Sequence, residues 1–176
     1  MTRATDVFLP LRERIRIARD ADAALFMSLH ADSLGDSQVK GASVYTLSEH
    51  SSDEEAALLA AKENKSDILA GTDLSVHDPI VAGILIDLAQ RDTNNKSIAF
   101  ADLLAADLGE ATKLLRNNRR FAGFAVLKSP ETPSVLIEIG YLSNAEDAKW
   151  LKEPEHLRQL GRAILKAVDR HFADHR

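Results

Sequence analysis

The sequence contains no cysteine, which excludes disulfide bonds and thiolate metal sites. It also lacks any apolar run approaching the roughly 20 residues that a membrane-spanning helix needs. A net charge of -5 argues against nucleic acid as the main partner. Neither a Gly-x-Ser-x-Gly elbow nor a glycine-rich phosphate loop is present, which disfavours an unrelated α/β hydrolase and a nucleotide-binding protein.

The first six residues are polar and do not resemble a secretory signal peptide. They are followed almost directly by a predicted helix, so the start of the sequence resembles the middle of a domain. The length of 176 residues is enough for one domain with a sizeable core.

Two apolar stretches end abruptly in polar residues. The first, residues 24–33, ends in His30, Asp32 and Ser33. Its apolar run is typical of a strand that is buried on both faces. The second, residues 134–144, carries Glu138 inside an apolar run. Because ligands gather beyond the carboxyl ends of strands in α/β sheets, both ends are candidates for chemistry.

Hydrophobic periodicity along the chain predicts an α/β fold, a mixed and mostly parallel sheet flanked by helices. The expected strands are 24–30, a half-buried 41–47, 124–127 and 134–138. The expected helices are 7–22, 52–61, 80–92, 104–115, 144–150 and a final one with the apolar stripe Leu157, Leu160, Ile164, Val168 and Phe172.

The segment from 51 to 120 is predicted to be a long helical insertion between strands. Ser52 is the expected N-cap of its first helix, with Glu55 reaching back. Residues 65–79 are expected to form a loop, and a helix break is expected at 93–95. The basic stretch 116–120 is expected to end the insertion.

His30 and Glu138 together favour a metal-assisted hydrolase. Neutral imidazole is a good zinc ligand, and a zinc-bound water has a pKa lowered towards about 7. A glutamate beside that water could accept its proton and later deliver it to a leaving amine. Two alternatives remain: His30 bonds a neighbouring backbone group, and Glu138 is a buried carboxylate paired with an arginine such as Arg3.

Five blocks of this sequence resemble the zinc-dependent N-acetylmuramoyl-L-alanine amidases of bacterial cell-wall turnover, over nearly the whole chain. The blocks are Thr2-Arg3 with Asp6, Leu11-x-x-Arg14-x-x-x-Ala18, residues 26–33, residues 41–45, and residues 135–144. The combination of His-Ala-Asp with Glu-Ile-Gly-Tyr-Leu-Ser-Asn is the specific part of the signal.

The resemblance implies a peptidoglycan hydrolase. It matches His30 to a zinc ligand and Glu138 to the catalytic glutamate. The family cleaves the amide between N-acetylmuramic acid and the L-alanine of the stem peptide. The insertion resembles that of the periplasmic cell-division amidases, in which an inserted helix covers the zinc site until an activator with a LytM-type domain displaces it. We place residues 87–93 over the metal, with Asp92 as the autoinhibitory carboxylate. The alternative is that Asp92 faces solvent at a helix break.

The sequence departs from the family at its start. Members of the family open with a strand that ends in a Gly-His-Gly motif, whose histidine is a second zinc ligand. A glutamate on the next helix supplies the third. Neither region has a counterpart in this sequence. The remaining histidines, which match no ligand position and are expected to be solvated, are His50, His77, His156, His171 and His175.

From this departure we expect residues 1–176 to form a partial amidase catalytic domain with an exposed sheet edge and an uncovered apolar face. We also expect weak zinc retention and little or no amidase activity of the isolated chain. The alternative function is a non-catalytic cell-wall or activator-binding module derived from an amidase.

Overall fold

The computed structural model describes residues 1–69 and 83–173, with side chains for 1–67 and 90–173. The chain divides into two units, each assembled from three segments. Unit 1 contains residues 1–26, 47–96 and 121–134, and unit 2 contains residues 27–46, 97–120 and 135–176. Both units are therefore closed by contacts between segments that are distant in the sequence.

A four-stranded sheet has the strand order β1-β4-β2-β3. The strands are β1 (Phe26–His30), β2 (Ala42–Leu47), β3 (Leu114–Ala122) and β4 (Ser134–Glu138). β2 and β4 are antiparallel, with Val44 opposite Ile137.

The two outer strands run parallel to their neighbours. Phe26 donates its N–H to Pro133, and Ile139 donates to His30, so the paired positions rise together along β1 and β4. The bond from Ala42 to Lys113 and the one from Ser48 to Ala122 give the same relation for β2 and β3. The predicted mixed, mostly parallel sheet is confirmed, and the carboxyl ends of β1 and β4 lie at the same end of the sheet.

Burial of the strands follows their positions in the sheet. Every residue of β4 is buried, and so is β2 except for its last residue, so the prediction of a half-buried 41–47 strand was wrong. β1 lies at an edge, and its Leu29 is 58% exposed, so the prediction that β1 is buried on both faces was also wrong. The sequence predicted an exposed sheet edge without naming a strand, and the structure gives that position to β1.

The other edge strand, β3, contains the basic stretch that was expected to end the helical insertion. The prediction was wrong because an edge strand tolerates polar residues that a central strand would not. Arg116 and Asn117 are exposed in β3, whereas Arg120 is buried. The helical part of the segment therefore ends at Ala111.

Within residues 1–69 and 83–173, five α-helices accompany the sheet: α1 (Leu11–Asp20), α2 (Glu54–Leu69), α3 (Gly83–Ala111), α4 (Ala145–Trp150) and α5 (Pro154–Ala173). None of the helices among the described residues is both long and apolar enough to cross a membrane.

Three details of the insertion differ from expectation. Asp53, rather than Ser52, caps α2 by accepting the N–H of Ala56 at 2.9 Å. α3 does not break at 93–95, because the Thr93 hydroxyl donates to the carbonyl of Pro130 at 2.8 Å while the backbone stays helical. Of the expected loop 65–79, residues 65–69 belong to α2 and the rest lies outside the described residues.

Unit 1 is built around a short 3₁₀ helix, η2 (Ala125–Leu127), where a strand was expected. α1 and α2 both pack against it. Asn64 of α2 holds this region in place: its side chain donates to the carbonyl of Gly123 and accepts the N–H of Ala125, each at 2.8 Å. These side-chain bonds replace the partners that a strand would supply.

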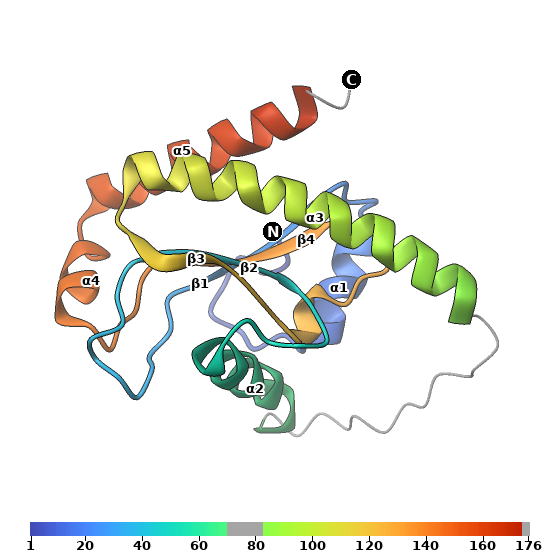
Figure 1. Cartoon of the computed structure of the whole chain (residues 1–176), viewed down its shortest axis with the longest axis horizontal. Coiled ribbons are helices and arrows are strands. Elements are labelled where there is room, and N and C mark those ends of the chain that lie inside the picture. The colour runs from blue at the N-terminus through green and yellow to red at the C-terminus, as the bar shows by residue number, and fades with distance from the viewer. Residues whose placement is uncertain (70–82, 174–176) are drawn as a thin grey trace. The chain divides into compact units, whose positions relative to one another are not determined.

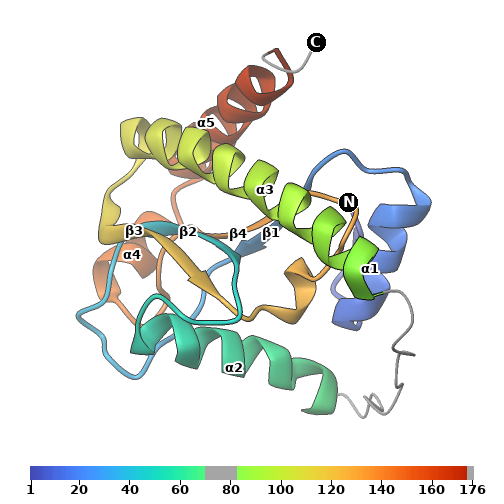
Figure 2. The same ribbon diagram turned by 45° about the vertical axis from the view of Figure 1, so that its right-hand side comes forward.

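In unit 2, α5 and the C-terminal part of α3 cover one face of the sheet (Figures 1 and 2). Asp107 of α3 is buried and pairs with Lys166 and Arg170 of α5, each at 3.0 Å. The buried face of α5 consists of Leu160, Ala163, Ala167 and His171. The predicted stripe was shifted, since Leu157 is 45% exposed, and the prediction of a solvated His171 was wrong.

Candidate active site

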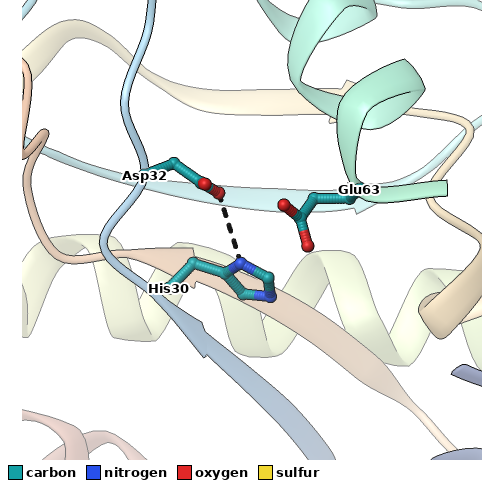
Figure 3. Close-up of side chains that lie close together, drawn as sticks. All are labelled: His30, Asp32 and Glu63. Carbon is teal, nitrogen blue, oxygen red and sulfur yellow. Dashed lines mark hydrogen bonds and ion pairs between the residues drawn. The ribbon is translucent and has the colours of Figure 1, made fainter. Parts of the chain in front are cut away.

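His30 is the last residue of β1, and its ring is held by two side chains of the same segment. The Nε2 atom lies 2.9 Å from the Ser28 hydroxyl, and the Nδ1 atom lies 3.3 Å from the Asp32 carboxylate (Figure 3). Glu63, also drawn in Figure 3, belongs to α2 of unit 1. The alternation along β1 aims Ser28 and His30 to the same side, which explains why the two can meet.

Glu138 is the last residue of β4 and is 0% exposed. Its Oε1 atom accepts the backbone N–H of Asp32 at 2.7 Å. A buried carboxylate is costly unless hydrogen bonds compensate it, and a bond of this length to a charged acceptor is among the stronger ones. The chain therefore keeps a carboxylate inside the sheet by bonding it to the segment that follows His30.

The segments that follow β1 and β4 continue to pair beyond the strands. Ile139 donates to the carbonyl of His30 at 3.0 Å, and Leu142 donates to the carbonyl of Asp32 at 2.7 Å. His30 and Glu138 thus come from adjacent parallel strands and lie at the same end of the sheet. This is the arrangement that the two sequence blocks predict; the chemical roles of both residues remain predictions.

A buried pair of tyrosines lies beside Glu138. Ser43 and Tyr45 of β2 share the face of the sheet on which Glu138 lies, because Ser43 is directly opposite Glu138. The Tyr45 and Tyr141 hydroxyls are 3.2 Å apart, and the Arg120 guanidinium stands 5.5 Å from the centre of the Tyr45 ring. Burial raises the pKa of both phenols, and the Arg120 charge opposes this for Tyr45.

Asp92 lies on α3 in unit 1, with its side chain 67% exposed. It pairs with Lys96 one helical turn away, at 2.7 Å. The prediction that it stands at a helix break was wrong, and its autoinhibitory role is untested. The side chains of residues 87–89, the first part of the predicted covering segment, lie outside the described residues.

The other histidines have mixed outcomes. His50 is exposed, as predicted. His156 stacks on Trp150 with ring centres 4.5 Å apart and lies 3.0 Å from its carbonyl, so the prediction of a solvated side chain was wrong. His77 and His175 lie outside the described residues.

The donor set of unit 2 fits part of a zinc site. Metal-bound histidines commonly donate their second ring N–H to a carboxylate, which is the position of Asp32 on Nδ1. Nε2, beside Ser28, is then the atom that can face a metal. A catalytic zinc ion usually has three protein ligands, and the His30 imidazole could supply one of them.

Sequence reasoning identified the ends of the two strands but assigned no role to Asp32. In the structure Asp32 contacts both candidate residues, through its side chain to His30 and its N–H to Glu138. The signal that could have identified it is the His-x-Asp spacing directly after a strand.

Comparisons with known proteins identify the family of this chain. The family model described as N-acetylmuramoyl-L-alanine amidase matches residues 1–170. The amidase AmiC of Escherichia coli O6:H1 (strain CFT073) is 37% identical over 99% of this chain and 42% of its own length. The amidase AmiA of Escherichia coli K12 is 35% identical over 98% of this chain and 60% of its own length.

Solved structures show the same fold. The N-acetylmuramyl-L-alanine amidase of Mycobacterium smegmatis aligns with a TM-score of 0.65 and 20% identity, over 99% of this chain and 66% of that one. The CwlD amidase of Clostridioides difficile, solved in complex with the GerS lipoprotein, aligns with a TM-score of 0.63 and 18% identity, over 98% and 74%. This chain thus spans about half the length of the curated relatives it matches, and it belongs to the N-acetylmuramoyl-L-alanine amidase family.

Proposed function

We propose that this chain contributes His30 as a metal ligand and Glu138 as the general base to an amidase that cleaves the bond between N-acetylmuramic acid and L-alanine in peptidoglycan. The observation that carries the proposal is the bond from the Asp32 N–H to Glu138, which joins the two family blocks at one end of the sheet. The family membership supplies the reaction class.

Each residue has a distinct part in this proposal. Glu138 accepts a proton from the attacking water and returns it to the leaving amine, while the Asp32 N–H holds Oε1 in place. The Asp32 carboxylate fixes the tautomer and orientation of His30 through Nδ1. A bound zinc ion would supply an activated water and polarise the amide carbonyl.

The activity of the isolated 176-residue chain is a separate matter. Since the resemblance matches only His30 of this chain to a zinc ligand, we propose that this chain holds zinc weakly and hydrolyses muropeptides slowly or not at all. This chain covers 42% of the length of AmiC and 60% of the length of AmiA, so the activity of the whole protein stays part of the proposal.

We further propose a periplasmic location and control by a LytM-domain activator. The support is the similarity to AmiA and AmiC and the resemblance of the insertion to that of the cell-division amidases. The complex of the CwlD amidase with the GerS lipoprotein shows that one protein of this fold is bound by a second protein.

Zinc titration by calorimetry, combined with a muropeptide assay, tests the proposal. The His30→Ala variant should lose the residual zinc affinity, whereas the matched variant of an exposed histidine, His50→Ala, should retain it. Equal zinc binding by both variants would reject His30 as a ligand. Tight binding of one equivalent with steady turnover by this chain would reject its predicted inactivity.

The alternative, a non-catalytic cell-wall or activator-binding module, is distinguished by a pull-down on purified peptidoglycan. Retention on peptidoglycan that is unchanged by His30→Ala and by Glu138→Gln, without hydrolysis in any longer version of the protein, would favour the module. Loss of hydrolysis in both variants of the longer protein would favour the enzyme.

A further inference from the structure

Two loops of unit 2 are joined side by side although about a hundred residues separate them. The first, the 32–41 loop, connects β1 to β2. The second, here called the 139–147 connection, comprises the residues between β4 and α4 together with the first turn of α4. Leu34 donates its N–H to the Ser143 hydroxyl at 3.1 Å, and the Asn144 side chain donates to the carbonyl of Ser37 at 2.7 Å. The 32–41 loop is therefore anchored along its length.

Asp147 is the centre of this attachment. Its Oδ2 atom accepts the N–H of Gly41 at 2.8 Å and the N–H of Tyr141 at 2.9 Å. One carboxylate oxygen thus binds Gly41, the last residue of the 32–41 loop, and Tyr141, which follows the end of β4. Bonds from backbone N–H groups to a charged acceptor are stronger than neutral ones, and this pair closes the loop at its far end.

Two glycines make the double attachment possible. Gly41 has φ +100° and Gly140 has φ +147°, conformations that side chains disfavour. A Cβ at Gly41 would lie 2.8 Å from the backbone of Leu114, and one at Gly140 would lie 3.2 Å from the Asp147 Oδ2 atom. The backbone is therefore shaped to bring both N–H groups to the same oxygen.

We infer that Asp147 is a positioning residue of the site: through Gly41 and Tyr141 it holds the 32–41 loop against the 139–147 connection and so keeps the Asp32 N–H on Glu138. The first residue of the loop donates to Glu138, and the last is fixed by Asp147. Tyr141 carries the same constraint into the buried tyrosine pair beside Glu138. The catalytic meaning of this role rests on the proposed function, but the geometry does not.

Amide NMR of the labelled 176-residue chain tests the inference without any activity measurement. A short hydrogen bond to a carboxylate shifts an amide proton downfield, and the Glu138→Gln variant identifies the Asp32 resonance by its response. In Asp147→Ala the Asp32 proton should move upfield, and its protection from hydrogen exchange should fall about tenfold more than that of the α3–α5 amides. Asp147→Asn, which keeps a weaker acceptor oxygen, should move the Asp32 proton in the same direction by a smaller amount.

Asn64→Ala is the matched control. Asn64 also bonds two backbone groups of a loop, but it does so in unit 1. It should lower the melting temperature to a similar degree and leave the Asp32 resonance in place. An unchanged Asp32 resonance in Asp147→Ala, or an equal change in Asn64→Ala, would overturn the inference.

Should Asp147→Ala not fold, the Asp147→Asn variant decides the question. The weaker neutral acceptor should shift the amides of Gly41, Tyr141 and Asp32 together; a shift confined to the first two would overturn the role at the site. Absence of zinc binding or hydrolysis would count against the proposed function and would leave these amide shifts unaffected.

Discussion

The backbone N–H of Asp32 and the Oε1 atom of Glu138 are 2.7 Å apart, although 106 positions separate the two residues in the sequence. The bond fixes one oxygen of a fully buried carboxylate and links it to the residue that orients His30. A carboxylate and a histidine that both contact one intermediate residue are held in a fixed relation, which is the preorganisation that the proposed roles of Glu138 and His30 require.

Replacing Glu138 by glutamine should separate stability from function. Glutamine keeps an oxygen for the Asp32 N–H and removes a buried charge, so thermal unfolding should show equal or higher stability. Amidase activity of a complete enzyme that carries the substitution should fall about 10²- to 10⁴-fold, since the proton acceptor is gone. A variant that keeps activity would show that Glu138 is not the base.

Asp32→Asn should lower the zinc affinity, whereas Ser28→Ala should not. Asparagine weakens the acceptor on Nδ1, so zinc affinity should fall about 10- to 100-fold. Alanine at Ser28 removes the hydroxyl that occupies Nε2, so affinity should stay equal or rise. Calorimetric titration measures both, and a fall of equal size in the two variants would contradict the assignment of Nε2 as the metal-facing atom.

Asp67 should contribute to stability as the remote cap of α1. Pro10 gives that helix no side-chain cap, and both Asp67 carboxylate oxygens instead accept the Leu11 N–H, at 2.9 and 3.2 Å. Asp67→Ala should lower the free energy of unfolding by about 1–3 kcal/mol, because a buried donor loses its partner. In denaturant titrations the exposed Asp20→Ala serves as control and should cost less than about 0.5 kcal/mol.

Alkaline pH should destabilise the fold through the tyrosine pair. Burial raises the pKa of Tyr45 and of Tyr141 above the unfolded value of about 10, so the folded protein binds these protons more tightly. Their contribution is fully present below pH of about 10 and is lost as the pH rises further. The chain has only these two tyrosines, so tyrosinate absorbance should appear together with unfolding. Ionisation of either phenol while the fold persists would contradict this.

Asp92→Ala should raise the basal activity of a complete enzyme if Asp92 is autoinhibitory. Its visible partner is Lys96, and an exposed pair of this spacing is worth about 0.3–0.5 kcal/mol, so stability should change little. Lys96→Ala breaks the same ion pair and keeps the carboxylate, which makes it the matched control. Equal activities of the wild type and Asp92→Ala would reject the autoinhibitory role.

The sequence predicts much of this fold because many of its signals are local. The apolar run to Glu138, the alternation up to Leu47 and the helix expected from 144 to 150 each depend on neighbours within a few residues. The errors concern signals whose meaning depends on distant partners. The basic stretch around Arg116 resembles the polar end of a helix unless its position in an edge strand is known. Residues 124–127 are as apolar as a strand, but residues 125–127 form η2.

By itself the sequence determined the family, the order of the elements and the two polar strand ends where chemistry is expected, since periodicity and motif spacing are written along the chain. Only the tertiary structure decided that β1 is an edge strand, that Asp32 bridges His30 and Glu138, and that Asp147 anchors the 32–41 loop. The physical reason is that strand order and long-range hydrogen bonds depend on which surfaces pack together, and no local pattern of residues specifies that choice.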